Sequence, residues 1–139
     1  MNKNIIFQEL IEKQRKNLIL ERKLSFSDIK RLSSYLNSSL FTQQCSLWTG
    51  YVTEIKNSSV FVNFFFNGKK QALHRILYYN FVDDISENEY LKYTCENKGK
   101  CCCINHLTKI KEKTIENNDI KDTNSDSETK NKKNITVEF

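Results

Sequence analysis

Residues 93–107 read YTCENKGKCCCINHL and hold four of the five cysteines and one of the two histidines. Thiolates and a neutral imidazole are ligands that Zn²⁺ prefers, and a structural zinc site takes four of them in a tetrahedral arrangement. Five residues separate Cys95 from Cys101 and four separate Cys101 from His106, while Gly99 permits a tight reversal of the chain. The spacing predicts a zinc knuckle formed by Cys95, one of the three adjacent cysteines and His106.

The fourth ligand of such a site has to come from another part of the chain, and Cys45 is the only cysteine outside the knuckle. Two alternatives stay open: the cysteines can be buried apolar side chains or disulfide partners, and Cys102 can replace Cys101 as the ligand. The segment after Met1 is charged and periodic, unlike a secretory signal peptide. We therefore expect a reducing intracellular compartment, cytoplasm or nucleus, in which a metal site is favoured over disulfides.

The composition limits the class of protein. A chain of 139 residues is expected to form one compact domain with a modest core. No apolar run approaches the roughly 20 residues that span a bilayer, so no membrane is expected as a partner. The net charge of +5 is compatible with binding to nucleic acid but is too small to indicate it alone. Abundant Asn, Lys and Ile and the absence of proline are typical of an AT-rich genome, such as that of a large DNA virus.

Residues 1–44 are predicted to form an N-terminal helical segment. Residues 4–23 carry apolar side chains at helical spacing, and their lysines and arginines form either a phosphate-binding face or an ordinary solvated face. Ser27 is the expected N-cap of a second helix, with Asp28 in its first turn.

The pattern changes to strands from Cys45. Residues 46–55 and 58–68 are rich in aromatic and β-branched residues. The second run is apolar on both faces, so we expect it to be covered on both sides. The pair Asn67-Gly68 predicts a type I′ turn into a third strand at residues 69–73.

Two further helices are expected, one from about residue 72 to 86 and one from about residue 106 to 121. Residues 45–120 would then form the zinc-binding domain. Residues 121–139 offer almost nothing to bury and are expected to be a disordered tail.

Three phrases carry a resemblance: CSLWTGYV from Cys45, ALHRILYYNFV around His74, and CENKGKC followed by INHL in the knuckle. Over roughly residues 45–118 the chain resembles the His-Me finger (HNH-like) endonucleases, in particular the His-Cys box homing endonucleases with zinc-binding loops. The resemblance implies an α+β fold with a small zinc-stabilised ββα-metal core and a β-hairpin or three-stranded sheet, here preceded by two helices. It also implies a structural Zn²⁺ held by Cys45, Cys95, Cys101 and His106.

The sequence departs from this superfamily at the general base. The active enzymes carry a histidine two residues before the first knuckle cysteine, where this chain has Tyr93. A tyrosine with the ordinary pKa of about 10 is mostly protonated at neutral pH and is a poor base. The resemblance also implies that Arg75 approaches the scissile phosphate and that Asn118, or Asn117, binds Mg²⁺. Tyr93, Arg75 and Asn118 are therefore the candidate catalytic residues, and we expect nuclease activity to be absent or very weak.

We accordingly expect a zinc-binding, nucleic-acid-binding protein of His-Me finger ancestry that is catalytically degenerate. Its partner would be double-stranded DNA, contacted through its phosphates. The residues predicted to make these contacts are Lys69, Lys70, Arg75, Lys98 and Lys100. Two alternatives stay open: an active Mg²⁺-dependent DNA endonuclease with an altered general base, and a protein-interaction module that binds a protein partner or a second copy of the chain.

Overall fold

The computed structural model describes residues 2–56 and 59–111, and the fold is α+β, as predicted. The helices are α1 (Lys3–Lys13), α2 (Phe26–Ser33) and α3 (Leu73–Phe81), with a 3₁₀ turn, η2, at Ile104–His106. The strands are β1 (Thr53–Glu54), β2 (Val60–Phe61), β3 (Asn63–Phe66), β4 (Lys69–Ala72), β5 (Glu89–Tyr93) and β6 (Leu107–Lys111). The predicted tail, residues 121–139, lies outside the described residues.

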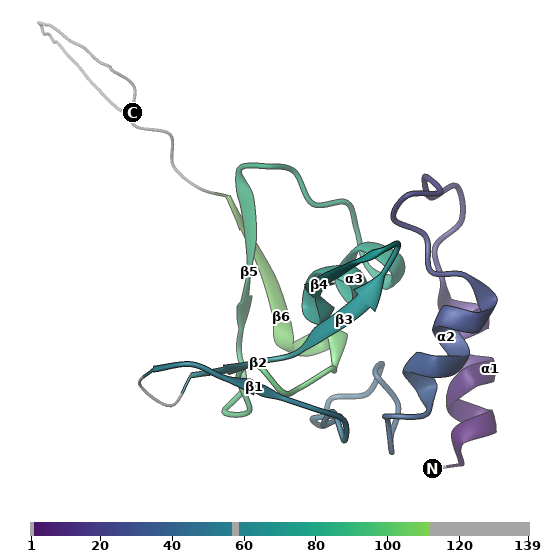
Figure 1. The fold of residues 1–139 in the computed structure, drawn as a ribbon, viewed down its shortest axis with the longest axis horizontal. Helices are drawn as coiled ribbons and strands as arrows, with labels where there is room; N and C mark the ends of the chain where they lie inside the picture. The colour runs from purple at the N-terminus through teal and green to yellow at the C-terminus, as the bar shows by residue number, and fades with distance from the viewer. Residues whose placement is uncertain (1, 57–58, 112–139) are drawn as a thin grey trace, which may run out of the picture.

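The strands pair as three separate antiparallel ladders, β1 with β2, β3 with β4 and β5 with β6. In Figure 1, α1 and α2 lie side by side at one edge and the β5–β6 pair stands toward the other. Between them lie α3 and the β3–β4 hairpin. Within the described ranges, no helix has the length and apolar character needed to cross a bilayer.

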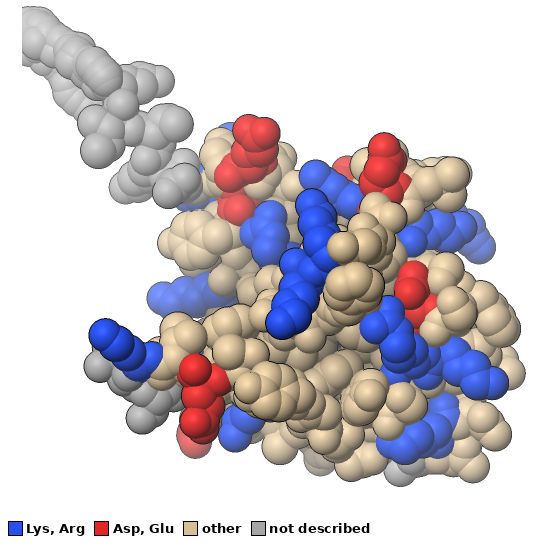
Figure 2. Space-filling model, viewed as in Figure 1, with Lys and Arg blue, Asp and Glu red and all other residues tan. Residues whose placement is uncertain are grey.

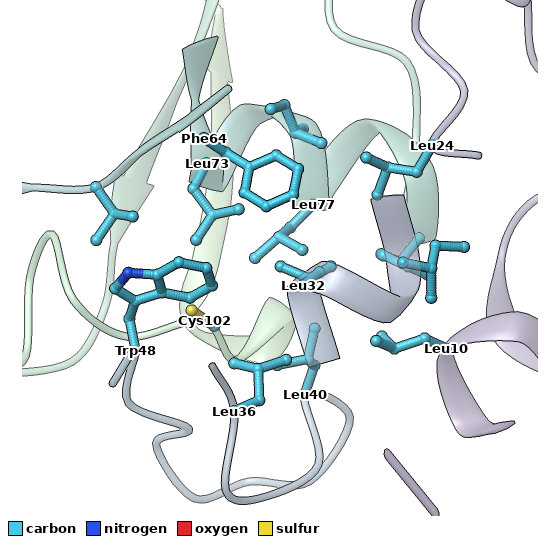
Figure 3. Packing of buried hydrophobic residues seen from close by; sticks show 14 of the residues in the cluster. Leu10, Leu24, Leu32, Leu36, Leu40, Trp48, Phe64, Leu73, Leu77 and Cys102 are labelled. Carbon is cyan, nitrogen blue, oxygen red and sulfur yellow. The ribbon is translucent and has the colours of Figure 1, made fainter. Parts of the chain in front are cut away.

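One cluster of buried apolar side chains joins the N-terminal helices to β3 and α3 (Figure 3). Its members include Leu10, Leu24, Leu32, Leu36, Leu40, Trp48, Phe64, Leu73, Leu77 and Cys102. Full burial of a leucine side chain is worth about 1.5–3 kcal/mol. The N-terminal helices therefore gain their stability by packing on the same core as α3.

The N-terminal helices begin and end at different residues from those predicted. Ser25, and not Ser27, is the N-cap of α2, because Ser25 and Asp28 form a capping box. The Ser25 hydroxyl accepts a hydrogen bond from the Asp28 amide at 3.1 Å, and the Asp28 carboxylate accepts one from the Ser25 amide at 3.0 Å. The first helix ends at Lys13 instead of continuing to residue 23. Asn17 has a φ of +64°, which a continuing helix does not allow.

The chain after α1 is held by Asn80, a fully buried residue of α3. The Asn80 side-chain oxygen accepts from the Gln14 side chain at 2.9 Å and from the Leu24 amide at 3.0 Å. Its nitrogen donates to the carbonyls of Arg22 and Ile76, at 3.0 and 2.9 Å. One amide group thus uses its full hydrogen-bonding capacity to fix the segment between α1 and α2.

The β3–β4 hairpin confirms the predicted turn. Asn67 and Gly68 both have positive φ, +54° and +84°, as a type I′ turn requires. The strand before it is shorter than predicted, because β2 and β3 are separate elements. The expectation that this strand is covered on both sides is wrong: Phe64 and Phe66 are buried, but Phe65 on the other face is 57% exposed.

Downstream of the hairpin, α3 confirms the first predicted helix, although it ends at Phe81. The helix predicted from residue 106 is wrong over the described part of it. Residues 107–111 form β6, which pairs with all of β5 from Glu89 to Tyr93. Leu107 and Leu91 are buried in this pair and form a small second cluster with Tyr78 of α3.

We expect Asn80→Leu to lower the free energy of unfolding by about 2–4 kcal/mol. The substitution keeps the size of the side chain but removes the side-chain partners of the buried Leu24 amide and of the Arg22 carbonyl. Urea unfolding of the two proteins measures the difference. Asn4→Ala, at an exposed position of α1, is the matched control and should change the value by less than about 0.5 kcal/mol. Equal effects of the two substitutions would contradict the role of Asn80.

Candidate metal centre

The register of the β5–β6 pair brings two predicted ligands together. Tyr93, the last residue of β5, pairs with Leu107, the first residue of β6. Beyond this pair the Thr94 amide donates to the His106 carbonyl at 2.9 Å. Cys95 follows on one side of the ladder and His106 lies on the other, so both side chains are placed at the same end of the two strands.

A turn over residues 97–101 returns the third ligand, Cys101, to this end. The amides of residues 100 and 101 both donate to the Asn97 carbonyl, at 3.1 and 3.0 Å. Gly99 has a φ of +85°, a conformation that L side chains rarely adopt. A Cβ atom at Gly99 would also overlap the Val60 carbonyl of β2. The predicted reversal at Gly99 is therefore confirmed, with close backbone packing as a second reason for glycine.

Cys45 reaches the site through a short antiparallel contact between residues 46–48 and 100–102. Leu47 forms an isolated bridge with Cys101. Backbone hydrogen bonds of 3.0 and 2.6 Å lie on either side of this bridge. The contact aligns the chain just after Cys45 with the chain at Cys101, and so brings the fourth predicted ligand beside the third.

The four side chains, called the tetrad below, are Cys45, Cys95, Cys101 and His106. Their ligand atoms all lie within 4.8 Å of one another. The sulfurs of Cys45 and Cys101 each lie 3.4 Å from His106 Nδ1. Bond lengths of about 2.3 Å for Zn–S and 2.0–2.1 Å for Zn–N place sulfur and nitrogen about 3.6 Å apart in a tetrahedral site. The tetrad can therefore hold a metal ion such as Zn²⁺.

The orientation of His106 suits metal binding. Its Nε2 lies 2.7 Å from the Gln43 carbonyl oxygen. A carbonyl oxygen only accepts, so Nε2 carries the proton, and in the neutral ring Nδ1 presents its lone pair to the sulfurs. Metal-binding histidines usually donate their second ring N–H to a carbonyl or carboxylate in this way.

The thiols of the tetrad differ in their surroundings. Burial raises the pKa of Cys101 to about 12. A hydrogen bond with the Asn97 side chain is the main cause that lowers the pKa of Cys45. A bound Zn²⁺ stabilises thiolates strongly enough to deprotonate its ligands. The tetrad is thus chemically able to supply three thiolates and one imidazole.

The choice among the three adjacent cysteines falls on Cys101. Cys102 is buried in the core cluster (Figure 3). Cys103 is fully buried, and its sulfur lies 2.9 Å from the Thr42 carbonyl oxygen. Neither belongs to the tetrad.

Tyr93 lies beside the tetrad, in an open cavity of about 620 Å³ that Cys45, Cys95 and Lys98 also line. Burial is the main cause that raises the pKa of Tyr93 above its ordinary value, with smaller contributions from the neighbouring thiols. Its ring centroid lies 5.5 Å from that of His74. Burial, assisted by Arg75, lowers the pKa of His74 to about 4, so this histidine is neutral at pH 7 and only a weak base.

Arg75, the other candidate catalytic residue in the described part of the chain, does not line that cavity. Arg75 lines a different cavity, together with Arg22. Asn118 and Asn117 lie outside the described residues. Among the predicted phosphate contacts, Lys69 and Lys70 are exposed on β4, while Lys98 and Lys100 are exposed in the loop of the metal centre.

Some residues that shape these sites were not found from the sequence. Gln43 acts through its backbone carbonyl, which no residue type reveals. The Asn97 side chain forms a hydrogen bond with Cys45, and its position between the knuckle cysteines was the only feature of the sequence that could have indicated this. Arg22 was among the basic residues of a possible phosphate-binding face in residues 4–23, but nothing in the residue pattern connected it to Arg75.

Comparisons with known proteins give one relative. No protein-family model and no solved structure matches the chain. The chain is 49% identical over 113 residues to an uncharacterised protein of Acanthamoeba polyphaga mimivirus, a match that covers 79% of this chain and 33% of that protein. The chain therefore spans about a third of the length of the relative it matches. A viral relative agrees with the compositional expectation.

We expect the purified protein to contain about one Zn²⁺ per chain. Loss of one ligand of four should weaken zinc binding at least tenfold. The variants that test this are Cys45→Ser, Cys95→Ser, Cys101→Ser and His106→Ala. Elemental analysis and competition with a chromophoric chelator measure the two quantities. Cys103→Ser is the control, because this buried thiol lies outside the tetrad. Undiminished zinc binding in the tetrad variants would overturn the assignment.

Gly99→Ala should destabilise the zinc-loaded protein by more than about 3 kcal/mol, because the new methyl group adds an overlap with β2 to the strain of a positive φ. Gly68→Ala is a matched control with nearly the same φ, +84°, and open space around its Cα. We expect it to cost only about 1 kcal/mol. Urea unfolding measures both values, and similar losses would show that the contact with Val60 is unimportant.

Proposed function

We propose that this chain is a zinc-stabilised nucleic-acid-binding module of His-Me finger ancestry that has lost its nuclease chemistry. The observation that carries the proposal is the tetrad. Cys45, Cys95, Cys101 and His106 are the four ligands that the resemblance implies, and they meet from three separate segments of the chain. Cysteines that serve only as apolar side chains would not be expected to converge with a histidine in this way.

The zinc ion would act as a structural cross-link. The tetrad joins the segment at Cys45, the turn around Gly99 and the start of β6. In small domains a bound metal commonly supplies the stability that a modest core lacks. Loss of the ion should therefore release the β5–β6 pair from the rest of the fold.

The basic side chains would supply the contact to nucleic acid. In Figure 2, lysines and arginines gather over the β3–β4 hairpin, with few acidic residues among them. Lys69 and Lys70 belong to this hairpin. Within residues 2–56 and 59–111, Lys69, Lys70, Lys98 and Lys100 form no ion pair with a carboxylate, so their charges are available to phosphates.

The proposed loss of nuclease chemistry rests on Tyr93. A general base has to be deprotonated near neutral pH, and the surroundings of Tyr93 raise its pKa further from that range. His74, the other titratable ring beside it, is a weak base because burial and Arg75 lower its pKa to about 4. Plasmid DNA incubated with the protein and Mg²⁺ should therefore stay intact.

A second candidate function, binding to a protein, is favoured by the exposed aromatic residues. Phe65 is 57% exposed and Tyr51 is 83% exposed. Exposed aromatic side chains are enriched at protein interfaces, but they also serve as stacking surfaces for bases. The experiment below separates the two functions.

We expect the zinc-loaded protein to bind duplex DNA with an affinity that falls at least tenfold between about 50 and 200 mM salt, because phosphate contacts release counterions. Fluorescence anisotropy of a labelled duplex measures this. Lys69→Ala/Lys70→Ala should weaken binding and reduce the salt slope by about 1–2.

The control is Lys30→Ala/Lys92→Ala, which removes the same charge from two exposed positions outside every predicted set of phosphate contacts. It should leave the salt slope closer to that of the wild type. No binding at low salt, or binding that does not respond to salt, would contradict the proposed function and favour a protein partner.

A further inference from the structure

A second cavity, of about 250 Å³, lies beside α3 and is separate from the metal centre. Its polar lining consists of Arg22, Gln71 and Arg75, and its apolar lining includes Phe66, Ile76 and Tyr79. We call it the arginine cavity. The residues come from the segment between α1 and α2, from the β3–β4 hairpin and from α3, so the cavity exists only in the folded chain.

The helical spacing of α3 separates the two sites. Successive residues of a helix are turned by about 100°, so Arg75 and Tyr79 share one face. His74 and Leu77 point about 150° away from them and line a small hollow next to Cys101 and Cys102. The arginine cavity and the metal centre therefore lie on opposite faces of the same helix.

The charge of the arginine cavity is unbalanced. Arg22 and Arg75 are its only charged lining residues, and within the described ranges neither forms an ion pair with a carboxylate. The guanidinium group of Arg22 lies 5.1 Å from the centre of the Tyr79 ring, which holds it at the wall of the cavity. Two guanidinium groups at one cavity provide forked donors that match the oxygens of a phosphate.

The remaining lining suits the rest of a nucleotide. Phe66 and Ile76 are buried and provide an apolar wall against which a flat ring can pack, while the Tyr79 ring is covered by Arg22. The Gln71 side-chain nitrogen donates to the Phe66 carbonyl at 3.0 Å, which leaves the side-chain oxygen of Gln71 as an acceptor. A volume of 250 Å³ lies just below the range of about 300–1,000 Å³ for drug-sized ligands, so it limits the occupant to one small unit.

We propose that the arginine cavity binds one nucleotide, either free or as a unit of a nucleic acid strand. Arg22 and Arg75 hold the phosphate, the apolar wall packs against the base, and Gln71 accepts a hydrogen bond from a base N–H. The site uses none of the tetrad residues and, of the predicted phosphate contacts, only Arg75. It goes beyond the proposed function, because a free nucleotide can bind here even if the chain binds no nucleic acid.

The test is isothermal titration of the zinc-loaded protein with adenosine 5′-monophosphate and with inorganic phosphate. We expect saturable one-site binding of the nucleotide, and weaker binding of phosphate alone because it lacks the base. Arg22→Gln and Arg75→Gln should each weaken nucleotide binding at least tenfold, about the effect of one charge-assisted hydrogen bond. Lys92→Gln, which removes the same charge from an exposed position on β5 that does not line the cavity, should leave binding within about twofold.

Gln71→Glu is a second, independent variant. It keeps both arginines and the shape of the wall but adds a negative charge, so it should also abolish nucleotide binding while the circular dichroism spectrum and the zinc content stay unchanged. Absence of saturable nucleotide binding to the wild type, or binding that survives all three cavity substitutions, would overturn the proposal.

Competition identifies the source of the nucleotide. If a short single-stranded oligonucleotide displaces adenosine 5′-monophosphate, the cavity takes a unit of a strand; if it does not, the cavity takes a free nucleotide. Duplex binding that responds to Lys69→Ala/Lys70→Ala without any nucleotide binding would leave the proposed function intact and remove the cavity proposal. Nucleotide binding without duplex binding would do the reverse.

Discussion

The antiparallel contact between residues 46–48 and 100–102 is the constraint on which the metal centre depends. It is only one bridge long, with a hydrogen bond on each side, yet it brings Cys45 to a knuckle about fifty residues later in the chain. Backbone contacts of this length are weak alone. A metal ion bound across it would add four strong bonds to the same junction, so contact and ion would stabilise each other.

The spacing in the knuckle was enough to predict that Cys95, one of the three adjacent cysteines and His106 would meet, because local geometry brings them together. Cys95 and His106 sit at one end of a two-stranded ladder, and the turn at Gly99 returns Cys101 by local hydrogen bonds. Cys45 was identified by elimination and by the resemblance. The spacing left Cys102 open as an alternative, whereas the resemblance implied Cys101; in the structure the Cys102 side chain packs in the core and Cys101 lies in the tetrad.

Other parts of the fold could not be predicted, because distant residues decide them. Residues 14–23 continue a helical pattern, but hydrogen bonds to Asn80 hold them in another conformation. Residues 107–111 also suit a helix, but pairing with β5 makes them a strand. The sequence pattern predicts that Phe65 is buried, but its side chain is exposed because only one face of its hairpin packs against the helices. In each case tertiary contacts override a local preference.

The hydrogen bonds of Asn80 also bear on how this chain can change during evolution. Two of its four partners are main-chain atoms of residues 22 and 24, and such atoms are present whatever side chain those positions carry. The neighbouring side chain of Leu20 is 84% exposed. Substitutions can therefore accumulate at exposed positions of this segment, such as Leu20, while its path stays the same. At those positions the side chain can vary because the path of the main chain is held by the amide group of one residue in α3.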